Sequence, residues 1–253
     1  MLLGPSRGYD ERSVDEKEEL ARYEWVFQVT DFIEHMEQAV LDLPALETLA
    51  LWDHQLQDAA VCTLVDGLGS LTQLDLRENL IGESGARAVA TALPRLISLN
   101  LSSNDIGDAG AIAIARLAGP MTSLRLAGNA IGDDSACAIA ASLTGLRVLD
   151  LGGNALGHDG GRAVATHLVE LEHVDLSGNA LGDEGVDGLS RGLPRCRYLN
   201  LAGNAVGDRG MQLRLQANPC PQLVARQRQR SHIHVGNKVV VHAGEDVFDV
   251  GEL

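Results

Sequence analysis

The sequence predicts an α/β solenoid, in which a curved parallel sheet lines the concave side and helices cover the convex side. The main observation is a repeat: similar units follow one another at a step of 25 residues from Leu46 to about residue 220. Within each unit, a period-two pattern typical of a short strand precedes an alanine-rich stretch typical of a helix. Aromatic residues make up only 3% of the chain, which favours many small packing layers over one bulky core.

The strand and turn of each unit follow from its pattern, L-x-x-L-x-L-x-x-N-x-[ILV]-G-D-x-G-A. In the unit that starts at Leu71, Leu74 and Leu76 alternate with polar residues, as a half-buried strand requires. The asparagine at the ninth position can donate to and accept from the backbone of the turn, so stacked units should carry an internal asparagine ladder. Its members are Asn79, Asn104, Asn129, Asn154, Asn179 and Asn204.

The helix of each unit is expected after a glycine that permits a tight turn. An aspartate follows this glycine in several units, and we expect it to cap the helix of its own unit. These aspartates are Asp108, Asp133, Asp183 and Asp208. No single unit can bury its apolar face alone, so the array needs a cap at both ends.

The repeated unit resembles the leucine-rich repeats, and within them the ribonuclease-inhibitor-like group. Its short length is also similar to the GALA-type bacterial repeats, whose name reflects their Gly-Ala and Leu-Ala positions. The resemblance covers seven units and implies a leucine-rich-repeat solenoid at residues 46–220. An acidic lead-in with an N-terminal cap is then expected at residues 1–45, and a C-terminal cap at residues 221–253.

The two predicted caps have strand and helix patterns of their own. At the C-terminal end, residues 232–235 and 238–241 are predicted to form a β-hairpin about Gly236-Asn237, followed by an acidic tail. Between residues 22 and 45, apolar residues first alternate like a strand and then recur at helical spacing. These residues are Trp25, Phe27 and Val29, then Phe32, Ile33, Met36 and Val40.

The net charge of −15 argues against nucleic acid and against an anionic membrane surface as partners, because both are polyanions that the field of the protein repels. No apolar run approaches the ~20 residues of a membrane span. The opening Met1–Gly4 is too short for a signal-peptide core. The four cysteines are scattered without a CxxC pair, as is typical of reduced thiols in a cytosolic protein. We therefore expect a cytoplasmic protein.

No motif predicts catalysis or a cofactor, since the sequence lacks a nucleophile elbow, a phosphate-binding loop and zinc-ligand spacing. Three histidines between residues 232 and 242 invite a metal interpretation, but the last falls on the opposite face of the predicted hairpin. Asp150, Asp175 and Asn200 should line up on adjacent strands, where a Ca²⁺ ion or a solvated acidic row are the two interpretations. We favour the solvated row, because two carboxylates and one amide are a thin shell for Ca²⁺. We expect no metal, no cofactor and no catalytic residue.

The exposed strand positions are the candidates for function, because every second side chain of a strand points to the concave face. Small side chains predominate in the middle of the array, whereas larger groups gather towards its ends. Trp, Tyr and Arg are enriched in binding hot spots, although Trp52 has a second interpretation, that it covers the junction with the N-terminal cap. The predicted protein-binding residues are Trp52, Asp53, His54, Asp75, Arg77, Asn100, Arg125, Asp150, His173, Asp175, Tyr198 and Asn200.

The leading hypothesis is a non-enzymatic protein-binding module, acting as a scaffold, an inhibitor or a recognition protein through its concave face. It rests on the resemblance, since a fold does not fix a function. One alternative is a regulatory partner of an enzyme, of the GTPase-activating type found among related repeat proteins. A second alternative is a secreted bacterial effector that acts as a ubiquitin-ligase adaptor, although residues 1–45 show no F-box pattern.

Overall fold

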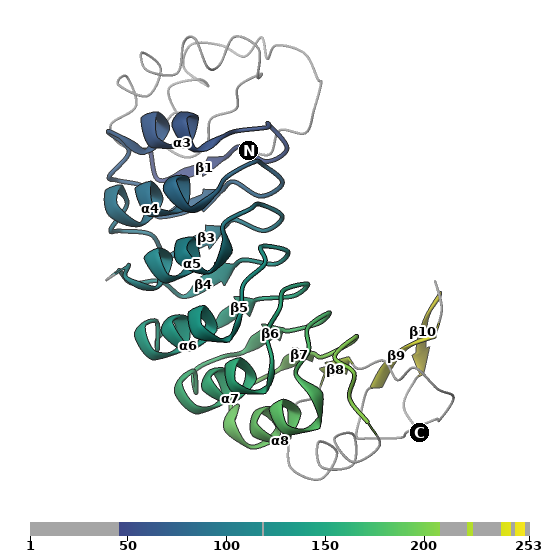
Figure 1. The fold of residues 1–253 in the computed structure, drawn as a ribbon. Helices are drawn as coiled ribbons and strands as arrows, with labels where there is room; N and C mark the ends of the chain where they lie inside the picture. The colour runs from purple at the N-terminus through teal and green to yellow at the C-terminus, as the bar shows by residue number, and fades with distance from the viewer. Residues whose placement is uncertain (1–45, 118, 208–221, 225–238, 244–245, 251–253) are drawn as a thin grey trace, which may run out of the picture. The chain divides into compact units, whose positions relative to one another are not determined.

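The computed structural model describes residues 46–117, 119–207, 222–224, 239–243 and 246–250 (Figure 1). The chain divides into two compact units, Met1–Leu124 and Arg125–Leu253. The predicted N-terminal cap lies outside the described residues, as does most of the predicted C-terminal cap.

The first unit alternates short strands with helices at the predicted step. Its strands pair in parallel, and the register aligns Leu49 with Leu74 and Leu74 with Leu99, so equivalent positions of successive repeats are neighbours. The middle residue of each strand is buried and its neighbours are less so, except at β3, whose last residue is also buried. In chain order the elements are β1 Thr48–Ala50, α3 Asp58–Val65, β2 Gln73–Asp75, α4 Glu83–Ala92, β3 Ser98–Asn100 and α5 Gly107–Ala115.

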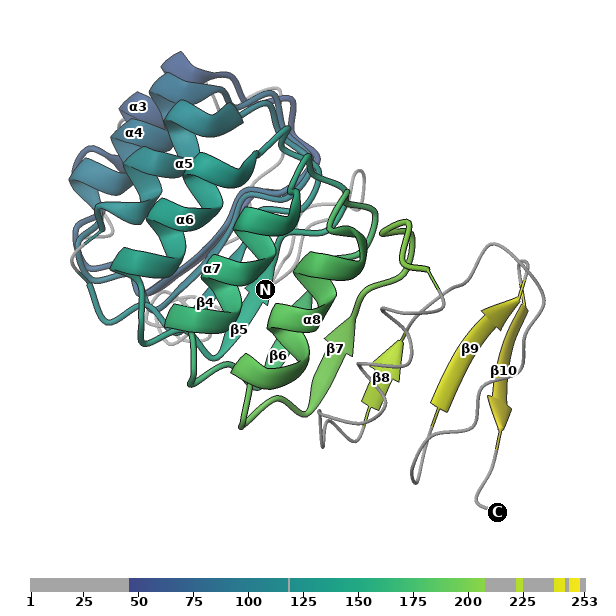
Figure 2. The same cartoon turned by 60° about the horizontal axis from the view of Figure 1, so that its bottom comes forward.

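The second unit has the same organisation, and Figure 2 shows its helices lying along one face of its strands. The register aligns Leu149 with Val174 and Val174 with Leu199. The predicted strand–turn–helix unit is therefore confirmed at every described repeat that includes both elements. Strand β4, Ser123–Arg125, lies at the boundary, and the elements that follow are α6 Asp133–Ser142, β5 Val148–Asp150, α7 His158–His167, β6 His173–Asp175, α8 Gly182–Gly192 and β7 Tyr198–Asn200.

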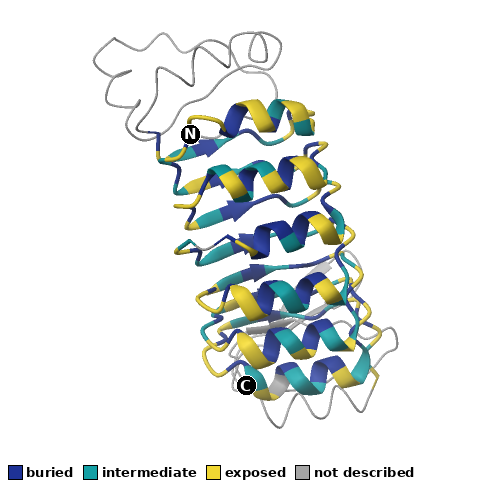
Figure 3. Cartoon of the chain, turned by 60° about the vertical axis from the view of Figure 1, so that its left-hand side comes forward, coloured by how far each residue is buried: buried dark blue, intermediate teal, exposed yellow. Residues whose placement is uncertain are grey.

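The core of each unit lies between its strands and its helices. Figure 3 shows the helices buried on one side and exposed on the other. In α4 the buried residues are Gly85, Ala86 and Val89, one apolar stripe at helical spacing. Packing at this glycine is close, because a Cβ atom at Gly85 would lie 2.7 Å from Asp58 Oδ1 of the preceding helix and 2.7 Å from Ile81 Cγ2, so one of these side chains would have to shift. Small residues therefore set the close spacing between successive helices.

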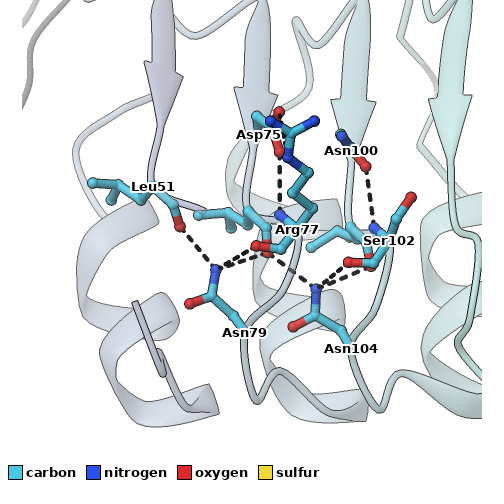
Figure 4. A network of polar contacts seen from close by, with 9 residues as sticks. Leu51, Asp75, Arg77, Asn79, Asn100, Ser102 and Asn104 are labelled. Carbon is cyan, nitrogen blue, oxygen red and sulfur yellow. Dashed lines mark hydrogen bonds and ion pairs between the residues drawn. The ribbon is translucent and has the colours of Figure 1, made fainter. Parts of the chain in front are cut away.

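The predicted asparagine ladder is confirmed (Figure 4). Asn79 Nδ2 donates to Leu51 O of the preceding repeat at 2.8 Å and to Leu76 O of its own strand at 2.8 Å. Asn79 Oδ1 accepts from His54 N and Leu56 N, each at 3.0 Å. The side-chain amides of Asn104, Asn154, Asn179 and Asn204 likewise donate to a carbonyl of the preceding repeat, and so pair backbone groups that burial would otherwise leave unsatisfied.

Asp108, Asp133 and Asp183 do not cap their own helices, so that prediction was wrong for these three residues, and Asp208 lies outside the described residues. Helix α6 begins at Asp133 itself, and no side chain caps it. Asp133 Oδ1 instead accepts from Gly157 N at 2.7 Å and from Gly160 N at 2.9 Å, at the start of helix α7 in the next repeat. Asp183 accepts from Gly207 N in the same way, at 2.7 Å. These carboxylates therefore bind the start of the next repeat's helix, and not that of their own.

We expect Asp133→Ala to destabilise the protein by about 1–2 kcal/mol, because it removes two charge-assisted bonds to a helix N-terminus. Asp134→Ala is the matched control, since Asp134 is exposed in the same first turn and carries the same charge. The midpoints of urea unfolding measure the difference. Equal midpoints for the two variants would show that the contact between repeats contributes nothing.

The C-terminal strands differ from the predicted hairpin. Strand β8, Gln222–Val224, pairs in parallel with β7, and β9, Val239–Ala243, pairs in parallel with β8. Strand β9 overlaps the predicted second hairpin strand at residues 239–241, but its antiparallel partner is β10, Asp246–Val250, which was expected to belong to the acidic tail. The valines and the phenylalanine of residues 246–250 favour a strand despite the flanking acids. Residues 232–235 lie outside the described residues.

Candidate functional site

The candidate site is the strand face, defined as the third, fifth and seventh positions of each repeat, on the side of the strands away from the helices. Most of these side chains are partly or fully exposed, because the leucines between them point into the core. Two of the predicted binding residues are buried and not exposed. Asn100 is buried, and His54 is only 4% exposed.

In the first unit, Trp52, Asp75 and Arg77 form one cluster, the Trp52–Arg77 anchor. The guanidinium carbon of Arg77 lies 5.2 Å from the centre of the Trp52 ring, which is a cation–π contact. On its other side, Arg77 Nε lies 3.7 Å from Asp75 Oδ2. The Arg77 side chain remains 37% exposed, so a positively charged group is held in place while still accessible. Asp53, beside the cluster, is also exposed.

The fifth-position residues have a structural role that the sequence analysis missed. Asp75 Oδ1 accepts from Arg77 N at 3.2 Å, and Figure 4 shows the same arrangement between Asn100 and Ser102. Asp150, Asp175 and Asn200 accept in the same way from the amide two residues ahead, at 3.0, 2.8 and 3.1 Å. This arrangement is an Asx turn. The sequence feature that could have predicted it is the recurrence of Asp or Asn at the fifth position of the repeat. Arg125 has no side-chain oxygen and cannot close such a turn.

In the second unit, Asp150 and Asp175 are adjacent, as predicted from the register. Burial raises the pKa of Asp150 above its ordinary value, and the charge of Asp175 adds to this; the hydrogen bond from Gly152 N and the charge of Arg125 oppose it. Asp175 Oδ1 accepts from the Ser177 hydroxyl at 2.6 Å, and its Oδ2 accepts from Asn200 Nδ2 at 2.8 Å. Both oxygens of Asp175 are therefore engaged within the protein.

Next to this row, His173 and Tyr198 stack across neighbouring strands, with ring centroids 6.4 Å apart. Burial, followed by the charges of Asp175 and Asp150, raises the pKa of the Tyr198 hydroxyl, so the phenol is neutral at physiological pH. The strand face of the second unit thus combines a fixed acidic row with an aromatic pair.

The described ranges contain no cluster of three or more histidine, cysteine, aspartate or glutamate residues arranged to hold a metal ion. Among the same residues, no helix is both long enough and apolar enough to cross a membrane.

Comparisons with known proteins address the family. A family model described as a leucine-rich repeat matches residues 70–90, 94–115, 120–140, 143–165, 169–190 and 197–213. No curated protein matches the chain. Among 182 matching solved chains is a crystal structure of an internalin from Listeria monocytogenes, with a TM-score of 0.56 and 24% sequence identity.

The likeness to the internalin covers 76% of this chain and 50% of that one, so the chain spans about half the internalin's length. At this identity it bears on the fold alone. The finer resemblance to the ribonuclease-inhibitor-like group and to GALA-type repeats stays a prediction. The six family matches, together with the same strand–turn–helix repeat in both units, identify the chain as a leucine-rich-repeat protein of the α/β solenoid class.

Proposed function

We propose that the protein is a non-enzymatic protein-binding module that uses its strand face. The observation that carries this proposal is the Trp52–Arg77 anchor, in which a partly exposed cation is held between an indole ring and a carboxylate. A side chain that is already fixed loses little conformational entropy when a partner binds, and Trp and Arg are the residues that most often dominate interface energies.

The residues at the seventh position of the later repeats support the same proposal. They carry small side chains on the strand face, so a partner can approach the sheet closely there. In the second unit the partly exposed ones are Ala127, Ser177 and Ala202, whereas Gly152 is buried. Ser177 and Ala202 follow the strands that carry the His173–Tyr198 pair, and small residues beside a few large ones are the expected composition of a surface whose binding energy is concentrated in the large ones.

The test begins with capture of a partner from a native lysate by the whole protein. Trp52→Ala combined with Arg77→Ala should then weaken binding of that partner at least tenfold, which is about 1.4 kcal/mol. Circular dichroism must first show that the double variant is folded. Capture of a GTPase or of a ubiquitin-ligase subunit would direct the proposal to a regulatory or an adaptor role.

The matched controls are two arginines on the helices, Arg87→Ala and Arg162→Ala. Each pairs with an acid of its own helix, Glu83 and Asp159 respectively, and each is well exposed. We expect both controls to bind normally. Normal binding by the folded double variant, with loss of binding in the helix variants, would move the interface to the helices and refute the proposal.

A further inference from the structure

The strand face of the first unit carries hydrogen-bond donors that the described residues do not use. Arg77 Nε lies 3.7 Å from Asp75 Oδ2, which is beyond hydrogen-bond range, and it has no other partner among these residues. The two Nη groups of Arg77 have no acceptor there either. Because the side chain is 37% exposed, Arg77 offers a partner a cation whose donors are still available.

Asn100, the neighbour of Asp75 on strand β3, supplies a second unused donor. The residue is only 8% exposed, and its Oδ1 accepts from Ser102 N at 3.1 Å. At the same position of a later repeat, Asn200 Nδ2 donates to Asp175 Oδ2 at 2.8 Å. Asn100 Nδ2 makes no such bond within the described part of the chain. An amide donor that is largely buried needs an acceptor, and a partner can supply one.

The two donors lie close together on the face. Leu76 N donates to Asn100 O at 2.8 Å, so the segment of chain that carries Arg77 runs directly beside Asn100. Figure 4 shows the Arg77 side chain extending along its strand towards Asp75 and Asn100. The residue beside Arg77 in the next repeat is the small, partly exposed Ser102, so a partner group can reach the guanidinium from that side.

The chemistry of these donors defines the group that fits them. A guanidinium has donors only, and the oxygen of the Asn100 amide is already engaged, so the matching group is one that accepts. An ionised carboxylate accepts through both oxygens and pairs with arginine in a charge-assisted bond. The nearby backbone amides of Arg77 and Ser102 already donate to side chains of their own strands. They are therefore not available to capture a chain terminus, which favours a side-chain carboxylate.

Two exposed acids restrict what can accompany that carboxylate. Asp53 and Glu78 directly follow Trp52 and Arg77 in the chain, and both are exposed. They repel additional negative charge, as does the net charge of −15. The surface therefore fits one carboxylate whose flanking residues are uncharged or basic, and not a run of acids.

We propose that the Trp52–Arg77 anchor, together with Asn100, binds the side-chain carboxylate of a single aspartate or glutamate of the partner protein. This inference rests on the proposed function, since it names the group that the strand face recognises. One carboxylate oxygen accepts from the Arg77 guanidinium and the other accepts from Asn100 Nδ2. The Trp52 ring holds the guanidinium in place through the cation–π contact.

A phage-displayed library of random peptides, selected on the whole protein, provides the probe. We expect the selected peptides to share one acidic residue with uncharged or basic neighbours. Replacing that acid by its amide in a synthetic peptide should weaken binding to the wild type by about tenfold or more, because the charge-assisted bonds are lost. A folded Arg77→Gln variant should bind both peptides equally. Selection of no peptide, or of peptides without a shared acid, would overturn the proposal.

Asn100→Asp tests the second donor. An aspartate keeps the acceptor that closes the Asx turn, as Asp75 does in the preceding repeat, but it removes the donor. We expect it to weaken the acidic peptide by about tenfold or more and to leave the amide peptide unchanged. Ala180→Asp, which adds the same charge at an exposed turn of the second unit, should leave both unchanged. Equal losses in the two variants would show that net charge, and not Asn100, is responsible.

The outcomes separate this inference from the proposed function. Equal affinity of the wild type for the acidic and the amide peptide, with loss of the captured partner in the Trp52→Ala and Arg77→Ala double variant, would refute carboxylate recognition alone. Acid-dependent peptide binding, with normal binding of the captured partner by the double variant, would instead refute the proposed use of the strand face.

Discussion

Replacing Gly192 with alanine is expected to destabilise the protein by about 3 kcal/mol, at the upper end of the usual cost of overpacking. A Cβ atom at this position would lie 2.2 Å from Ala165 O and 2.7 Å from Ala165 C. Both are backbone atoms of helix α7, so rotating a side chain cannot relieve the clash, and helix α8 must move away from α7. Chemical denaturation measures the loss as a lower midpoint.

Gly188→Ala provides the matched control in the same helix. A Cβ atom there would lie 3.5 Å from Arg162 Cα, an ordinary van der Waals distance. The control should therefore stabilise the protein by about 0.5–1 kcal/mol, because alanine favours the helix more than glycine does. The packing explanation requires opposite signs for the two variants. Stabilisation by both variants would mean that helix propensity, and not the contact between repeats, determines the outcome.

The repeat pattern alone predicted the strands, the helices and the asparagine ladder. Each depends on residues that recur at one step, and a stack of identical units leaves few other ways to bury Leu74 and Leu76 or to satisfy Asn79. The burial of His54 was predictable by the same reasoning. It stands one step before Asn79, but its residue type suggested a binding surface instead of a ladder position.

Contacts between repeats could not be predicted from one unit. The reach of Asp133 to Gly157 and Gly160 depends on how closely successive helices stack, and the pattern of a single repeat does not contain that distance. The Trp52–Arg77 contact likewise joins side chains of two repeats, and sequence reasoning placed them near each other without predicting the stacking. Repeat geometry thus follows from the sequence, whereas contacts across repeats require the packed structure.

Asn179→Asp should cost at least about 3 kcal/mol at neutral pH, because it puts a carboxylate where an amide donates three hydrogen bonds. Asn179 is 8% exposed, and its Nδ2 donates to Leu151 O, Leu176 O and Ser177 O at 2.9, 3.0 and 3.2 Å. The substitution keeps the size and the acceptor, so the loss measures the donors and the buried charge. Urea unfolding provides the measurement.

The control for the added charge is Ala180→Asp, one residue further along the same turn. Ala180 is exposed, and the equivalent position of an earlier repeat naturally carries Asp105. We expect this variant to remain within about 0.5 kcal/mol of the wild type, as exposed substitutions usually do. Lowering the pH should reduce the cost of Asn179→Asp, because protonation removes the buried charge and gives the carboxyl group a donor. A pH-independent loss equal in both variants would mean that charge near the turn, and not the ladder, causes the destabilisation.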